Sequence, residues 1–122
     1  MKKKETICIM ADFGKGPYAW LREANELPPF VGINIANAWD GFDDGFEFLK
    51  GLENDFKKWI YDFENNCNKK DFDWEAFNNI GIDLSGKIKH IVGNKYDVEY
   101  HIPWEDPNYN DKSNNNIIFI EE

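Results

Sequence analysis

The chain has 122 residues, a formal net charge of −9 and 16% aromatic residues. This length allows one domain and little else, since a second core would need roughly another 50 residues, and an acidic chain with so many large apolar side chains is not a disordered tail. The charge argues against nucleic acid as a partner, because its phosphates are also negative, and favours a basic protein. We therefore expect a single globular domain over residues 1–122.

The first third of the chain predicts strands. Residues 6–13 are apolar on both faces, which is typical of a central strand. Residues 14–17 read Gly-Lys-Gly-Pro and predict a turn, after which residues 18–22 fit either a strand or the first turn of a short helix. Residues 30–36 alternate in polarity and predict another strand.

Two helices are expected next. From about residue 43 to about residue 64, apolar side chains recur at helical spacing and form one broad stripe. A second helix is expected to begin at Asp73, a good N-cap residue, and to end at about residue 92. Gly81 and Gly86 each cost about 1 kcal/mol inside a helix, so we expect the second helix to break between them.

The remainder of the chain predicts two more strands. Residues 95–102 alternate in polarity, residues 103–116 form a long polar loop, and residues 117–120 close the chain as a short strand. The order of elements predicts an α+β fold, with a small, mainly antiparallel sheet and two helices packed on one face. No run of residues resembles a membrane span or a signal peptide, so we expect a cytoplasmic protein.

The sequence indicates neither a metal site nor a catalytic centre. Cys8 and Cys67 are the only cysteines, and with His90 and His101 they do not form a zinc-type spacing or an expected disulfide. Glu99 and His101 are expected on the polar face of a strand, opposite Val98 and Tyr100, where His101 is either structural or exposed to solvent. No serine or cysteine stands beside a base that would activate it. We therefore expect no catalytic residues, no metal and no cofactor.

Four carboxylates gather around the expected start of the first helix. An EF-hand register starting here would place Phe42 and Gly51 at two essential ligand positions, which argues against a calcium loop. The carboxylates either only stabilise the helix N-terminus or also form an acidic patch that steers a basic partner, and the two roles can coexist. These residues are Asp40, Asp43, Asp44 and Glu47.

A tryptophan and a tyrosine stand in the polar, proline-bounded loop after residue 102. Aromatic side chains flanked by charge are typical of the centre of a protein–protein interface. The alternative is structural, with Trp104 folded back over the sheet edge as a lid. The candidate anchors for a partner are Trp104, Glu105, Asp106 and Tyr109.

A single acidic, aromatic-rich domain without catalytic machinery resembles the small immunity proteins of bacterial polymorphic and contact-dependent toxin systems. The resemblance is to a class and carries no diagnostic motif, so it assigns no residue. It implies an inhibitor, not an enzyme, that binds a cognate toxin, often a basic nuclease, and has no nucleic-acid or membrane partner. Two alternatives remain open: a small carboxylate-dependent enzyme acting on a sugar or another small substrate, and an adaptor or structural subunit.

Overall fold

The computed structural model describes residues 4–109 and 114–122, with six strands and two α-helices. The strands are β1 (Thr6–Ile9), β2 (Pro17–Arg22), β3 (Ile33–Asn37), β4 (Gly41–Phe42), β5 (Asp97–His101) and β6 (Ile117–Phe119). The helices are α1 (Glu53–Asn66) and α2 (Trp74–Val92), and short 3-10 segments are η1 (Glu47–Leu52), η2 (Gly93–Lys95) and η3 (Asn114–Asn116).

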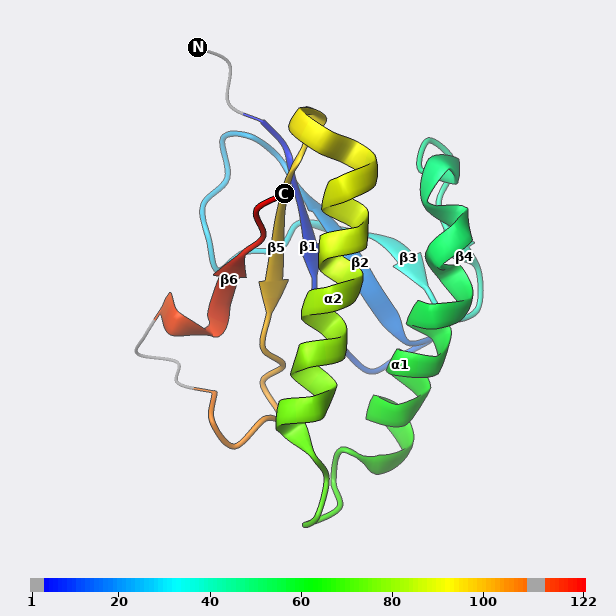
Figure 1. The fold of residues 1–122 in the computed structure, drawn as a ribbon, viewed down its shortest axis with the longest axis vertical. Helices are drawn as coiled ribbons and strands as arrows, with labels where there is room; N and C mark the ends of the chain where they lie inside the picture. Colours follow the sequence, from blue (N-terminus) through cyan, green and yellow to red (C-terminus); the bar gives the residue numbers. More distant parts are fainter. Residues whose placement is uncertain (1–3, 110–113) are drawn as a thin grey trace.

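All six strands belong to one sheet, in the order β4-β3-β2-β1-β5-β6. β1 and β5 run parallel at its centre, and the other neighbouring pairs are antiparallel. Both α-helices cover the same face of this sheet (Figure 1). The predicted α+β class, with a mainly antiparallel sheet and two helices on one face, is confirmed. None of the helices in the described part of the chain is both long and apolar enough to cross a membrane.

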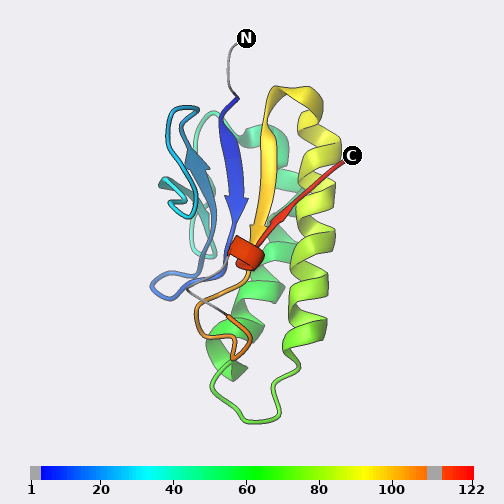
Figure 2. The same cartoon turned by 90° about the vertical axis from the view of Figure 1, so that its left-hand side faces the viewer.

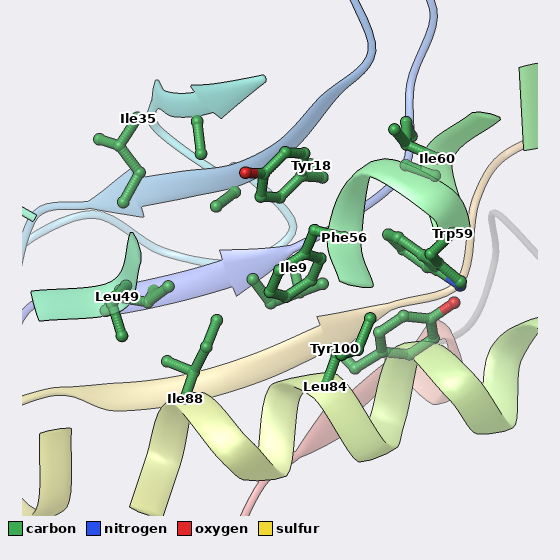
Figure 3. Close-up of a cluster of buried hydrophobic side chains, with 14 of the residues drawn as sticks. Ile9, Tyr18, Ile35, Leu49, Phe56, Trp59, Ile60, Leu84, Ile88 and Tyr100 are labelled. Carbon is green, nitrogen blue, oxygen red and sulfur yellow. The ribbon is translucent and has the colours of Figure 1, made fainter. Parts of the chain in front are cut away.

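The core lies between the sheet and the two helices (Figure 3). Aromatic rings stack across this layer: the ring centroids of Tyr18 and Phe56 are 4.6 Å apart, and those of Trp59 and Phe77 are also 4.6 Å apart. Both pairs are buried. Burial of one large apolar side chain contributes roughly 1.5–3 kcal/mol, so this layer is the main source of stability.

The second helix does not break between Gly81 and Gly86, and that prediction is wrong: α2 is continuous. A Cβ atom at residue 81 would collide with the Tyr100 ring and lie 2.7 Å from Cζ2 of Trp59. Glycine therefore lets α2 lie close against β5 and α1. The packing gained across this contact offsets the conformational cost of about 1 kcal/mol for glycine in a helix.

The first helix begins later than predicted. Residues 43–46 form a turn in which the Phe46 N–H donates to the Asp43 carbonyl at 3.0 Å, and the 3-10 segment η1 separates this turn from α1. Gly45 has φ +96°, a value outside the right-handed helical region. A regular helix therefore cannot run through residue 45.

The strand boundaries also need correction. Residues 18–22, which fitted two alternatives, belong to β2, between β1 and β3. The strand expected at residues 30–36 begins at Ile33, because Gly32 adopts φ +91° against the Leu21 carbonyl. The two-residue strand β4 was not predicted, since two residues carry no periodic pattern.

The face of the sheet opposite α1 and α2 is covered differently. Figure 2 shows the β2–β3 connection (residues 23–32) standing out from the sheet on the side away from the helices. Arg22 ties this connection to the sheet, because its Nη1 donates to the Phe30 carbonyl at 3.1 Å. We call this side the helix-free face.

Candidate functional site

A buried network of charged side chains lies on the helix-free face. The Arg22 guanidinium binds the Glu99 carboxylate through two hydrogen bonds, from Nη2 to Oε2 at 2.8 Å and from Nη1 to Oε1 at 3.1 Å. His101 Nε2 lies 3.0 Å from the same Glu99 Oε1. All three residues are buried. Glu99 and His101 lie on the face opposite Val98 and Tyr100, as the alternation predicts, and this polar face is buried rather than open to solvent.

Glu99 stays ionised inside this network. Burial alone would raise its pKa, but the hydrogen bonds from His101 and Arg22 together outweigh burial and lower the pKa below its usual range. Burial also disfavours the charged form of Arg22 and would lower its pKa. The hydrogen bond to Glu99 outweighs burial, together with nearby negative groups, so the pKa of Arg22 lies above its ordinary value. The pair is thus a charged, bidentate contact between β2 and β5, which lie on either side of β1.

Cys8 borders this network but is chemically inert. Burial raises the pKa of its thiol to about 12, since it outweighs the opposing effect of Arg22. Its Sγ, a Glu99 oxygen and a His101 nitrogen lie within 4.8 Å of one another, as metal ligands might. A metal would need a thiolate at Cys8 and a Glu99 carboxylate released from Arg22. The three side chains therefore fit the ion pair already present rather than a metal ion. Both Cys8 and Cys67 are free thiols.

A cleft of about 630 Å³ opens beside His101 on the helix-free face. Its walls come from the ends of β1, β2 and β5 and from the loops at residues 23–32 and 102–109. Four aromatic side chains line it, and Asp12 and His101 add polar groups. The aromatic residues are Trp20, Phe30, Trp104 and Tyr109.

Trp20 lies on the helix-free face of β2, like Arg22, because it pairs with Cys8 in regular register. The register between β2 and β3 shifts on both sides of Ala19, which is the signature of a β-bulge. Tyr18 therefore lies on the helix side, where it stacks on Phe56, although it is only two residues from Trp20. The Trp20 indole is fixed on the helix-free face by a hydrogen bond of 3.2 Å from its Nε1 to the Met10 carbonyl.

Large apolar side chains remain open to solvent around the cleft. Leu27 is 72% exposed, Trp104 69% and Phe30 53%, and all three line it. The alternative in which Trp104 folds down as a lid predicts a buried ring, and the ring is exposed. Exposed aromatic groups gathered at one recess are typical of an interaction site.

The mouth of the cleft carries negative charge. Asp12 lines it, and the exposed residue Glu105 follows Trp104 in the loop that forms one wall. Partial burial raises the pKa of Glu105, a backbone hydrogen bond opposes this, and the negative charge of Asp12 raises it further. The two carboxylates therefore repel one another and would both be relieved by a cation.

Asp106, in contrast, supports the loop from inside. It is 3% exposed, and its two oxygens accept hydrogen bonds of 2.8 Å from the Asn78 side-chain amide and from the Asn108 N–H. The Asn78 carbonyl oxygen in turn accepts a hydrogen bond of 2.6 Å from the Tyr100 hydroxyl. Among the four predicted anchors, Trp104 and Tyr109 line the cleft, Glu105 is exposed on the same loop, and Asp106 fastens this loop to α2.

The predicted acidic patch lies elsewhere. Its four residues are exposed and occupy the turn between β3 and β4 and the approach to η1. Glu47 accepts a hydrogen bond of 3.0 Å from the Gly45 N–H, and such backbone contacts lower its pKa. β4 and β5 stand four positions apart in the sheet, about 19 Å at a spacing near 4.8 Å. Asp40, Asp43, Asp44 and Glu47 therefore do not share a site with Trp104.

Sequence reasoning missed Arg22, Asp12 and Phe30, which come from separate segments. No known family model matches the chain, and no curated protein or solved structure is significantly similar to it.

Proposed function

We propose that this protein inhibits another protein by binding it, and that the partner is a basic bacterial toxin against which it provides immunity. The observation that carries the proposal is the cleft on the helix-free face, where exposed aromatic side chains surround a negatively charged mouth. Such a recess offers both apolar contact area and charge to a basic partner.

The distribution of charge supports fast association. The formal net charge of −9 attracts a basic partner over a distance, and steering of this kind raises association rates by roughly 10- to 1000-fold at low salt. Asp40, Asp43, Asp44 and Glu47 add to this field from the other edge of the sheet. Trp104 and Tyr109 would then slow dissociation by filling apolar pockets of the partner, as interface hot spots do.

The groups near the cleft offer little to a reaction. The Cys8 thiol is neutral and buried, His101 is held by Glu99, and Asp106 is bonded within the loop. A nucleophile needs an adjacent, accessible base, and these three groups provide none. This chemistry is consistent with a binding protein.

A carboxylate-dependent enzyme is the second candidate, and one observation favours it. The raised pKa of Glu105, close to Asp12 and to aromatic rings, is the type of arrangement that a general acid requires. This candidate predicts turnover of aryl glycosides or similar small substrates that Glu105→Gln abolishes. Absence of turnover across such a panel would remove it.

The proposed function is tested by recovering the partner. Tagged protein is used to capture proteins from a lysate of its own organism, with washes at low and at high salt. One stoichiometric basic protein, weakened but retained at high salt, is expected. That protein should be toxic when expressed alone and harmless when co-expressed with this chain. A captured partner without toxicity would contradict immunity, and a result with no partner would contradict binding altogether.

The steering role of the acidic patch has its own test. The double variant Asp43→Lys/Asp44→Lys is expected to lower the association rate about tenfold at low salt, with unchanged thermal stability, in stopped-flow binding to the recovered partner. Asp71→Lys/Asp83→Lys is the matched control, because it makes the same change in net charge at exposed positions elsewhere. Equal rates for the two variants would show that only the total charge matters.

A further inference from the structure

We infer that the cleft on the helix-free face is a receptor for an arginine side chain on the partner's surface. The inference rests on the proposed function in one respect, since it takes the ligand to be part of a protein. It assigns an arginine guanidinium of the partner to the cleft on the helix-free face. The argument depends on three properties of the cleft: its walls, its charge and its rigid floor.

The walls suit a flat cation. Trp104 is open to solvent, and Trp20 is fixed by its hydrogen bond to the Met10 carbonyl, so each can present a ring to a ligand. A guanidinium stacks on aromatic faces more readily than the compact, strongly hydrated ammonium of lysine. The volume of about 630 Å³ falls within the range of roughly 300–1,000 Å³ usual for pockets that enclose ligands. It therefore has room for a long side chain and part of its loop.

The charge at the cleft selects a cation over an anion. Asp12 lines the recess and carries its negative charge. Among the cleft-lining residues in the described part of the chain, none is lysine or arginine. The Asp12 carboxylate would repel a phosphate or carboxylate ligand and attract a guanidinium.

The floor and one wall are held in place by the buried network. Glu99 fixes the His101 ring, and Arg22 is 4% exposed, so the guanidinium of Arg22 lies behind the cleft surface. Two strong bonds to Glu99 neutralise its positive charge there. Arg22 also holds the Phe30 carbonyl, which secures the wall formed by residues 23–32. The recess is thus preformed, and this lowers the ordering cost of binding.

The test uses short peptides and therefore does not depend on finding the partner. ¹⁵N-labelled full-length protein is titrated with acetyl-Gly-Arg-Gly-amide, and in parallel with peptides in which lysine or citrulline replaces arginine. We expect saturable shifts of the Trp104 and Trp20 indole N–H resonances with the arginine peptide, weaker ones with lysine, and none with citrulline, which has the same shape but no charge. The indole of Trp59, bonded to the Phe77 carbonyl in the core, serves as an internal reference.

Substitutions of cleft residues test whether the arginine peptide binds in the cleft. Trp104→Ala and Asp12→Asn are each expected to weaken the arginine peptide about three- to tenfold. Asparagine keeps an oxygen for the Phe13 N–H, which Asp12 Oδ1 binds at 2.8 Å, so Asp12→Asn removes the charge and retains this contact. Trp39→Ala is the matched control, since Trp39 is 70% exposed and Trp104 is 69% exposed, and Trp39 does not line the cleft.

Several outcomes would overturn the inference: equal binding of arginine and citrulline peptides, tighter binding of lysine than of arginine, or no saturable shift at the two indoles. The recovered partner gives a separate result. If Trp104→Ala and Asp12→Asn neutralise it as well as the unaltered protein, the arginine inference fails while the proposed function stands. If the peptides bind as expected but the partner is not toxic, the arginine receptor stands and immunity fails.

Discussion

The two faces of the central sheet are both closed to water, but by opposite means. β5 contributes Val98 and Tyr100 to the layer beneath the helices, and Glu99 and His101 to the helix-free face. On the first face, apolar surface is buried by two long helices. On the second, an ion pair is enclosed by one loop, and the loop leaves a recess. The helix-covered face thus supplies most of the stability, and the helix-free face has the freedom to form a binding site.

The largest effect on the helix-free face is expected when one partner of the Arg22–Glu99 ion pair is removed. Arg22→Met would leave the Glu99 charge buried and uncompensated, and would release the loop at Phe30. We expect a loss of about 3–5 kcal/mol in the free energy of unfolding, measured by urea denaturation. Arg22→Met/Glu99→Leu should recover most of it, because apolar side chains can replace a buried pair. A loss below about 1 kcal/mol for the single variant would show that the network is dispensable.

A second prediction probes the helix-covered face through its closest contact. Gly81→Ala would force a methyl group against Tyr100 and Trp59, and overpacking of this kind costs about 1–3 kcal/mol. Gly86→Ala is the control in the same helix, where a Cβ meets nothing within 4 Å, and it should stabilise the protein by about 0.5–1 kcal/mol. Thermal denaturation of both variants measures the difference. If both changes stabilise, α2 does not depend on close contact at residue 81.

At low pH, the helix-free face should lose stability before the helix-covered face does. The pKa of Glu99 is lowered in the folded protein, so its contribution to stability is complete above the ordinary glutamate value of about 4.3 and is lost as the pH falls through the lowered value. Glu99→Gln should therefore flatten the pH dependence of unfolding below pH 5, by at most about 1.4 kcal/mol per pH unit. Unchanged slopes in urea titrations at successive pH values would contradict this.

The smallest expected effect concerns the link between the two faces. Asp106→Asn would place an amide group against the Asn78 amide and weaken the bond that fastens the 103–109 loop to α2. A loss of about 1 kcal/mol in stability is expected, together with weaker partner binding as Trp104 and Tyr109 lose their fixed position. Glu105→Gln, at the exposed neighbouring residue, should change stability by less than about 0.5 kcal/mol. If the two variants behave alike, Asp106 does not hold the loop.

Periodic patterns in the sequence predicted the elements of the helix-covered face, apart from the start of α1 and the continuity of α2. Apolar residues at helical spacing predicted α1 and α2, and alternation predicted β5. The same alternation placed Glu99 and His101 on the polar face of β5, but it did not show that this face is buried, since nothing local indicates that Arg22 will pair with Glu99. Gly81 was predicted to break the helix. The sequence does not show that a side chain here would collide with the Tyr100 ring, nineteen residues further along the chain.

The candidate site was only partly predictable for a related reason. The loop with Trp104 and Tyr109 was found from composition, since aromatic residues are unusual in a polar segment. Tyr18 and Trp20 lie on opposite faces because of the bulge at Ala19, which the sequence pattern does not show. Asp12 and Phe30 join the cleft only through the order of strands in the sheet, which one sequence does not reveal.

The parallel pairing of β1 with β5 has a consequence for how the chain reaches this structure. Thr6 pairs with Asp97. β1, which is synthesised first, therefore has one unpaired edge until β5, near the end of the chain, has been synthesised. Contacts between such distant segments slow folding, because a long loop must close before they form. During synthesis, the apolar residues of β1 therefore remain open to other chains until most of the protein has left the ribosome. A nascent chain of this design depends on the β1–β2 hairpin to shield it in the meantime.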